Sequence, residues 1–211
     1  MKTQRVIITI ILSFLLISLI ACQLLIIFKS NKETDNYIDL EQYLTTSKET
    51  MSIGKTKQLI KSKSNYSYAI NYPHLDNKKI NEQINTILER EINNLKKKVN
   101  IDQSNDTLII NYEIYEYDNT ISFIILKKYL SDNVLNINTY IFETDTGMII
   151  NNIFVNDKQQ EFKEKYDFNT NYIALNNTQV LFYSIVDNNL QKEELEINEI
   201  KDYLEIKIEQ E

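Results

Sequence analysis

The chain has 211 residues, with 23 Lys and Arg against 30 Asp and Glu, which gives a formal net charge of −7. Nucleic acid is therefore not an expected partner, because phosphate binding needs an excess of Lys and Arg on one face. Two Gly exclude a Gly-rich phosphate loop, while one Cys and one His exclude a disulfide framework and a Cys/His zinc site within the chain. We expect no cofactor, and the 43% of hydrophobic residues is typical of a folded domain.

The first feature along the chain is an apolar stretch without charges, from Val6 to Phe28. As a helix it would span roughly 34 Å, which is enough to cross the hydrocarbon core of a membrane. Lys2 and Arg5 precede it, and this cationic bias favours a cytoplasmic N-terminus. We therefore predict a short cytoplasmic tail (1–5), a single-pass transmembrane anchor (6–28) and a C-terminal part outside the cell membrane.

The same stretch contains Leu19-Ile20-Ala21-Cys22, which fits a lipoprotein cleavage box with Cys22 as the lipidated residue. Against that alternative, the residues from Leu24 to Phe28 stay apolar where a mature lipoprotein becomes polar. A simple secretory peptide is a third interpretation. All three place the rest of the chain on the outer face.

Residues 29–55 are mixed and polar, and we interpret them as a stalk, with a short helix near 37–44 as the alternative. Residues 56–211 form the predicted extracytoplasmic domain. Alternation between Tyr66 and Tyr72 predicts a strand that stops at Pro73. Apolar residues at steps of three and four then predict a long amphipathic helix over 77–99, capped by Asp76 or Asn77.

Three extended runs of matched length follow the helix, over 107–117, 120–130 and 133–144, and their short connections predict an antiparallel meander. Gly147 lies in a turn where a positive φ is useful. The remaining expectations are a short helix over 159–168, a hairpin of 171–175 with 179–186, and an acidic stretch over 195–208 that turns from alternation to helix. The predicted fold class is α+β, with an antiparallel sheet meander packed on one long amphipathic helix.

Several of these motifs occur in the order of a known family. They are Tyr72-Pro73, the pattern Ile80-Asn81-Glu82-Gln83-Ile84-Asn85, the turn Asp145-Thr146-Gly147 and Asn152-Ile153-Phe154, followed by a last hairpin, strand and short helix. Over about residues 56–208 the chain resembles the extracytoplasmic domain shared by RsiV-type anti-sigma factors and the N-terminal, non-catalytic part of PdaC-like peptidoglycan deacetylases. The resemblance implies a Gram-positive source and a domain of the class that binds lysozyme or wall glycan.

The chain departs from that family in three ways. It has no Gly-Gly-Ala-His-like loop between the second and third meander strands, and the stretch between Phe154 and Phe168 is short. Only five residues precede the predicted anchor, and no deacetylase domain follows Glu211. We therefore expect a sensing or wall-binding domain without either effector.

Two groups of residues offer candidate catalytic or cation-binding chemistry. His74 follows a turn-forming Pro, but no nucleophile motif accompanies it, so we interpret it as a surface residue. The carboxylates of Glu113, Glu116, Asp118 and Asp145 could serve a glycosidase or a cation site, but such groups arise by chance at this acid content.

The candidate ligand-binding residues are tyrosines, because Tyr gives a large, stiff contact area with a polar tip. Five lie on predicted strands: Tyr112, Tyr115, Tyr117, Tyr129 and Tyr140. Packing in the core is the competing interpretation for them. The acidic C-terminal end could attract a cationic wall-attacking protein such as lysozyme, with a solvated helix face as the competing interpretation.

These observations favour a membrane-anchored, non-catalytic domain that binds peptidoglycan or a lysozyme-like protein. One alternative is an accessory or degenerate relative of a peptidoglycan deacetylase. Another is a regulatory membrane subunit that acts through its span.

Overall fold

The computed structural model describes residues 39–45, 53–155, 157–166, 172–176 and 178–205. All of them except Asp39 belong to one compact unit, Leu40–Glu211. The predicted anchor 6–28 and Cys22 lie outside the described residues. Within the described ranges, no helix combines the length and the apolar composition of a membrane span.

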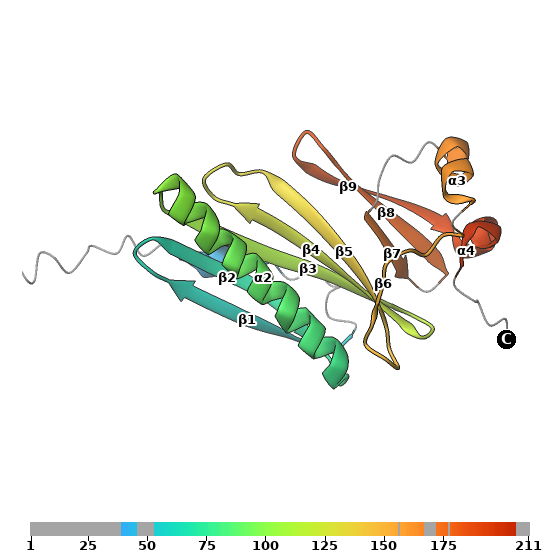
Figure 1. Ribbon diagram of the computed structural model, residues 1–211, viewed down its shortest axis with the longest axis horizontal. Coiled ribbons are helices and arrows are strands. Elements are labelled where there is room, and N and C mark those ends of the chain that lie inside the picture. Colours follow the sequence, from blue (N-terminus) through green and yellow to red (C-terminus); the bar gives the residue numbers. More distant parts are fainter. Residues whose placement is uncertain (1–38, 46–52, 156, 167–171, 177, 206–211) are drawn as a thin grey trace, which may run out of the picture. The chain divides into compact units, whose positions relative to one another are not determined.

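Six strands form the first sheet, in the order β1-β2-β3-β4-β5-β6 (Figure 1). Their bounds are β1 Lys55–Ser62, β2 Tyr66–His74, β3 Asp106–Tyr117, β4 Thr120–Tyr129, β5 Leu135–Glu143 and β6 Ile149–Ile150. Every neighbouring pair is antiparallel except β2 and β3, which are parallel. The long helix α2 (Lys78–Asp102) connects these two strands, because parallel neighbours need a crossover between their ends.

Helix α2 begins as its sequence predicts and continues three residues past the predicted end at 99. The side chain of Asn77 accepts the Ile80 N–H at 3.2 Å, which caps the first turn. The helix ends at Gln103, whose φ of 48° is left-handed. The apolar residues at steps of three and four are buried against the sheet, and they are Ile80, Ile84, Ile87, Leu88, Ile92, Leu95 and Val99.

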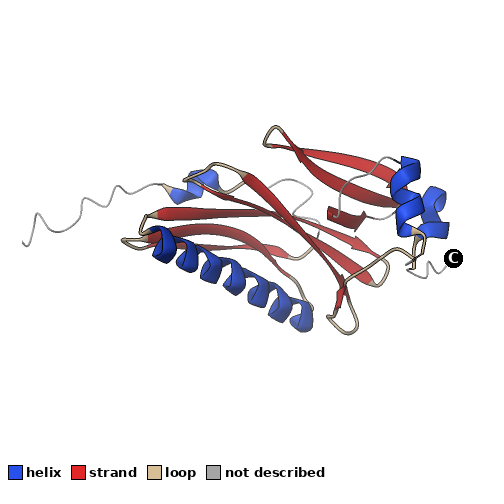
Figure 2. Cartoon of the chain, turned by 45° about the horizontal axis from the view of Figure 1, so that its top comes forward, coloured by secondary structure: helices blue, strands red, loops and turns tan. Residues whose placement is uncertain are grey.

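A second sheet packs over β3, β4 and β5 on the opposite face of the first one (Figure 2). It consists of three antiparallel strands, β7 Tyr172–Asn176, β8 Gln179–Val186 and β9 Asn189–Glu196. Side chains of both sheets meet in one core cluster of Tyr115, Ile124, Ile137, Ala174, Leu181 and Tyr183. The described unit therefore has α2, the first sheet and the second sheet as successive layers.

Short helices cover the outer face of the second sheet. They are α3 (Gln159–Tyr166), α4 (Ile197–Ile200) and the 3-10 helix η3 (Lys201–Tyr203). Phe162 of α3 lies 5.6 Å from Phe182 of β8 and 5.4 Å from Tyr203, measured between ring centres. Strands β7 and β8 are therefore covered on both faces, whereas β9 is largely exposed.

The compact unit begins with a 3-10 helix, η1 (Leu40–Tyr43). Leu40 is buried against Ala69 and Ile109 on the side of the first sheet opposite α2. The side-chain amide of Asn111 donates to the Tyr43 carbonyl at 3.0 Å and accepts the Thr45 N–H at 2.9 Å. Residues 40–45 thus pack on the domain, ahead of the predicted boundary at 56.

Most predicted elements are confirmed, and three differ. The α+β class, the long helix, the meander and the positive φ of Gly147 (70°) agree with the prediction. Strand β2 continues through Pro73, because β2 pairs with β3 only up to Ile70 and one side of the strand is unpaired beyond it. The prediction also missed β1 and β9, since both strands are largely exposed and lack an apolar alternation.

Candidate functional site

Two of the five predicted tyrosines are inside the protein. Tyr112 is 3% exposed on the α2 face, and its hydroxyl lies 2.7 Å from the Thr56 hydroxyl. Tyr115 is 6% exposed between the two sheets, where its hydroxyl donates to Glu113 at 2.8 Å. These two rings therefore have the core role that was the competing interpretation, and they offer no surface to a ligand.

The other three tyrosines are half-buried. Tyr117 packs against the cluster between the second sheet and its covering helices. Tyr129 on β4 and Tyr140 on β5 pack at the margin of the core beneath α2. Of the five predicted tyrosines, Tyr129 and Tyr140 lie on the same surface, beside α2.

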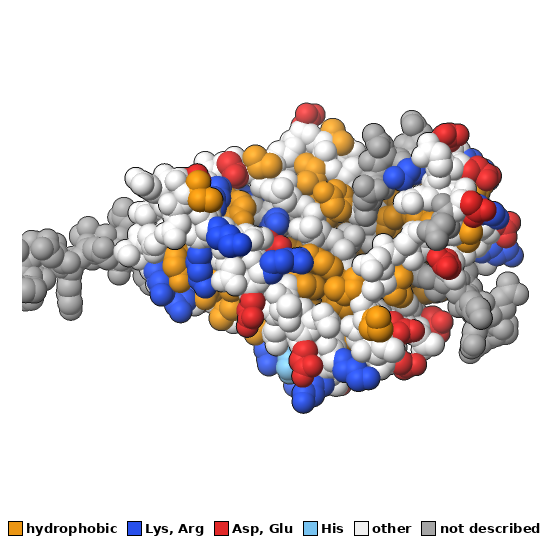
Figure 3. Space-filling model, in the orientation of Figure 1, with side chains coloured by type: hydrophobic (Ala, Val, Ile, Leu, Met, Phe, Trp, Pro, Cys, Tyr) orange, Lys and Arg blue, Asp and Glu red, His pale blue; other side chains and the backbone are white. Residues whose placement is uncertain are grey.

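That surface exists because α2 covers only part of the first sheet. The helix lies over β2 and β3, so β4 and β5 continue beside it (Figure 1). Alternate residues of these strands point to the helix side, and the register places Lys127 opposite Asn136 and Phe123 opposite Tyr140. Hydrophobic and basic side chains reach the surface there (Figure 3). We call Arg90, Lys127, Tyr129, Asn138 and Tyr140 the polar strip.

Arg90 and Tyr140 form its centre. The Arg90 guanidinium lies 5.9 Å from the centre of the Tyr140 ring and donates a hydrogen bond to its hydroxyl. Tyr140 continues an aromatic row through Phe123, 6.4 Å away, and Phe142, 6.5 Å away, measured between ring centres. Burial raises the pKa of Tyr140, although Arg90 opposes this, so the phenol is protonated at neutral pH. The ring is thus held rigidly by its neighbours.

A buried carboxylate sets the charge of the polar strip. Glu91 has a side chain only 4% exposed and accepts a hydrogen bond from Lys127 at 2.7 Å. Arg90 lies 3.8 Å from the same carboxylate. Two cations therefore share one buried anion, so Arg90, Lys127 and Glu91 together carry one excess positive charge in a chain whose net charge is −7. A fixed ring, an amide and a positive charge together suit a ligand that carries both sugar rings and carboxylates.

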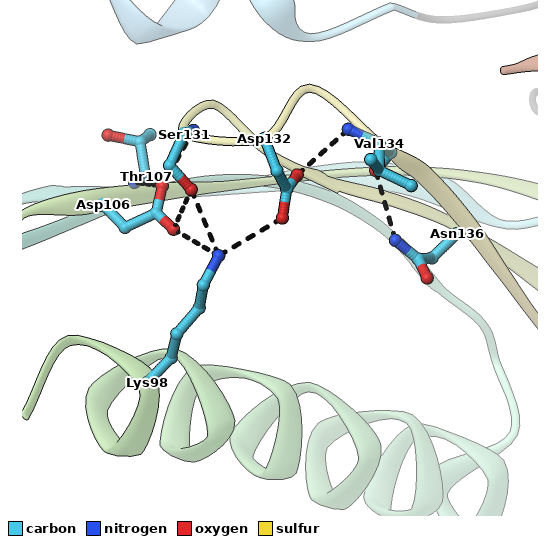
Figure 4. Close-up of polar contacts among 7 residues, drawn as sticks. All are labelled: Lys98, Asp106, Thr107, Ser131, Asp132, Val134 and Asn136. Atoms are coloured by element: carbon cyan, nitrogen blue, oxygen red, sulfur yellow. Dashed lines mark hydrogen bonds and ion pairs between the residues drawn. The ribbon is translucent and has the colours of Figure 1, made fainter. Parts of the chain in front are cut away.

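An ionic cluster closes one end of the strip, where α2 ends (Figure 4). Lys98 donates to Asp106 at 2.8 Å, to Ser131 at 3.1 Å and to Asp132 at 3.4 Å. Its ammonium group also lies 4.1 Å from the centre of the Tyr129 ring. The cluster ties the helix to the first residue of β3 and to the β4–β5 loop.

This cluster contains Ser131 beside Lys98, but the lysine is held in its charged form and cannot act as a base that activates the serine. Burial alone would lower the pKa of Lys98, yet the hydrogen bonds and charges of Asp106 and Asp132 raise it above its usual value. A lysine that serves as a base needs a lowered pKa. Moreover, the Ser131 hydroxyl donates to Asp106 at 2.7 Å. We therefore assign the cluster a structural role.

The remaining candidates do not form one site. His74 is exposed at the end of β2, as expected. Glu113 accepts hydrogen bonds from Tyr115 and from Tyr183, at 2.8 and 2.7 Å, so it fastens the two sheets together. Burial strongly raises the pKa of Tyr183, which keeps this phenol a donor. Glu116 lines an open cavity of about 450 Å³ near the start of α2.

The acidic residues near the C-terminus lie along β9, α4 and η3 and directly after η3. Those within the described residues are Glu193, Glu194, Glu196, Glu199, Asp202 and Glu205, and all are exposed. Glu209 and Glu211 lie outside the described residues. This acidic surface belongs to the second sheet, whereas the polar strip belongs to the first.

Three residues of the polar strip were missed at the sequence level: Arg90, Lys127 and Asn138. The signal for Lys127 and Asn138 was a polar side chain on the same strand face as buried neighbours such as Ile125 and Phe142. Arg90 gave no such signal, because it lies on the exposed face of an amphipathic helix.

No protein-family model matches the chain, and no curated protein matches it significantly. The resemblance to the RsiV-type and PdaC-like extracytoplasmic domain therefore stays a prediction.

Proposed function

We propose that this protein is a membrane-anchored, extracytoplasmic, non-catalytic domain that binds the glycan of peptidoglycan on the polar strip. The observation that carries the proposal is the rigid, half-buried Tyr140 ring between a cation and an aromatic row, beside the carboxamide of Asn138. The anchor is proposed from the apolar stretch Val6–Phe28.

The charge of the strip favours peptidoglycan over a lysozyme-like protein as its ligand. Peptidoglycan carries carboxylates on its peptides and amides on its sugars, and these groups match the cations and the amide of the strip. A cationic protein would meet Arg90 and Lys127 with charge of the same sign, which disfavours binding there. The acidic surface of β9 and α4 is where such a protein would bind instead.

The test is binding of the full chain, purified in mild detergent, to insoluble peptidoglycan and separately to lysozyme, at low and moderate salt. Tyr140→Ala should weaken peptidoglycan binding by about tenfold or more, since a central aromatic residue supplies much of the binding free energy. Tyr140→Phe keeps the ring and should lose only about threefold, the effect of one hydrogen bond. Tyr172→Ala, at the exposed first residue of β7, is the matched control and should bind normally.

Each variant must first show an unfolding midpoint close to that of the original protein, so that a binding loss reports the surface. Peptidoglycan binding that is unchanged in Tyr140→Ala would refute the strip as the site. Binding that moderate salt abolishes in every variant would leave non-specific charge attraction as the explanation.

A further inference from the structure

Two long strand edges remain unpaired in the described part of the chain. There, β1 pairs only with β2, and β9 pairs only with β8 (Figure 1). Each of these edge strands has eight residues, and each is largely exposed. An unpaired edge presents a row of N–H and C=O groups that can continue the sheet with another strand.

The other edges differ from these two. Strand β6 has only two residues. The outer edge of β7 is already occupied, because the N–H groups of Ile173 and Leu175 donate to the hydroxyls of Thr139 and Ser122 at 3.2 and 2.8 Å. β1 and β9 are therefore the two described edges long enough to accept a further strand.

The two edges carry opposite charges. Strand β1 contains Lys55, Lys57 and Lys61 and no acidic residue. Strand β9 contains Glu193, Glu194 and Glu196 against Lys192 alone. Like charges would oppose pairing of β1 with a second β1, or of β9 with a second β9, whereas β1 and β9 attract each other.

We propose that β1 of one copy of this protein pairs with β9 of a second copy, antiparallel, to join the sheets of neighbouring molecules. Placing Lys55 opposite Glu196 brings Lys57 opposite Glu194 in the same register. It also places Lys61 opposite Leu190, and the alkyl stem of the lysine can cover that side chain. This assembly is independent of the function proposed for the polar strip.

The pairing is head-to-tail, because the two edges lie on different sheets of the same molecule. Each copy in an assembly therefore keeps one basic and one acidic edge for the next copies, and growth continues as an open row. The interface is small, so we expect reversible assembly that rises with protein concentration.

The test is sedimentation velocity of the full chain in density-matched detergent over a wide concentration range. The original protein should form species larger than a dimer as its concentration rises. The basic-edge variant Lys55→Glu/Lys57→Glu and the acidic-edge variant Glu194→Lys/Glu196→Lys should each stay monomeric, with association weakened by about tenfold or more.

An equimolar mixture of the two variants is the decisive measurement. In that mixture every β1 edge again meets a β9 edge of opposite charge, so assembly should return, which a merely misfolded variant could not produce. The control is Lys96→Glu/Lys97→Glu on the exposed face of α2, which changes the net charge by the same amount as the basic-edge variant and should assemble normally. An original protein that stays monomeric throughout, or a mixture that fails to recover, would overturn the proposal.

Discussion

Asp106 shows how one buried side chain fixes the junction of three elements. Its side chain is 1% exposed and accepts hydrogen bonds from Lys98, from the Thr107 N–H, and from both the N–H and the hydroxyl of Ser131. Burial alone would raise the pKa of Asp106, but these donors together hold it below its usual value. The charged form is therefore stabilised in the folded protein.

Asp106→Asn should lower the free energy of unfolding at pH 7 by about 3 kcal/mol, because Lys98 would lose its main partner. A carboxylate whose pKa is lowered on folding contributes stability above its unfolded-state pKa, near pH 4, and loses it as the pH falls through the folded-state value. The difference between the two proteins should therefore shrink below about pH 4. Urea unfolding at pH 7 and at pH 3 checks both expectations.

Asp102→Asn is the matched control, since Asp102 is exposed at the end of the same helix. Its effect should stay within about 0.5 kcal/mol. An equal loss in both variants would mean that the general charge near the end of α2, rather than the Asp106 cluster, stabilises the protein.

At the scale of elements, the contact between the two sheets depends on hydroxyl side chains. Strand β7 lies at the edge of the second sheet, and its N–H groups would be buried without partners if the first sheet were purely apolar there. Ser122, fully buried on β4, accepts the Leu175 N–H at 2.8 Å. A polar residue in the middle of an apolar strand therefore satisfies the backbone of another sheet.

Ser122→Ala should cost about 1–2 kcal/mol of folding free energy, because it leaves a buried N–H without an acceptor. The amide of Leu175 should also exchange with solvent faster, which hydrogen exchange measures. Ser184→Ala, half-buried on β8, serves as the comparison and should change stability little. Equal effects of both substitutions would contradict the assigned role of Ser122.

At the scale of the whole molecule, residues 40–45 connect the preceding chain to the domain. Leu40 is 5% exposed, and the amides of Asn111 and Asn71 bind the backbone of Tyr43 and Thr45. The compact unit accordingly begins at Leu40. We expect this segment to be part of the fold and the residues before it to be dispensable for folding.

Removal of residues 1–38 should therefore leave the unfolding free energy nearly unchanged and release the protein from the membrane fraction, if 6–28 is its anchor. Removal of residues 1–45 should lower the unfolding free energy by about 3 kcal/mol more, because the protein loses the buried Leu40 and the hydrogen bonds of Asn111 and Asn71 to Tyr43 and Thr45. Cell fractionation and urea unfolding of both shortened chains measure these effects. Equal stability of the two would show that residues 40–45 do not support the domain.

Local pattern in the sequence determined the long helix, the meander and the turn at Gly147. Periodicity, caps and turn residues act over a few neighbours, so Asn77 and the apolar steps of α2 could be recognised without the fold. The exposed strands β1 and β9 were not predicted, because a strand without a buried face has no apolar alternation in its sequence.

The tertiary structure alone decided which tyrosines reach the surface and what lies beside them. Tyr112 and Tyr140 both lie on strands and face the α2 side, yet one is buried and the other half-buried, because α2 lies over β3 whereas Tyr140 lies beside the helix, against the exposed Arg90. Arg90 and Tyr140 are 50 residues apart and meet only through packing of α2 beside the sheet. Such contacts depend on how elements stack in space, which a local pattern does not encode.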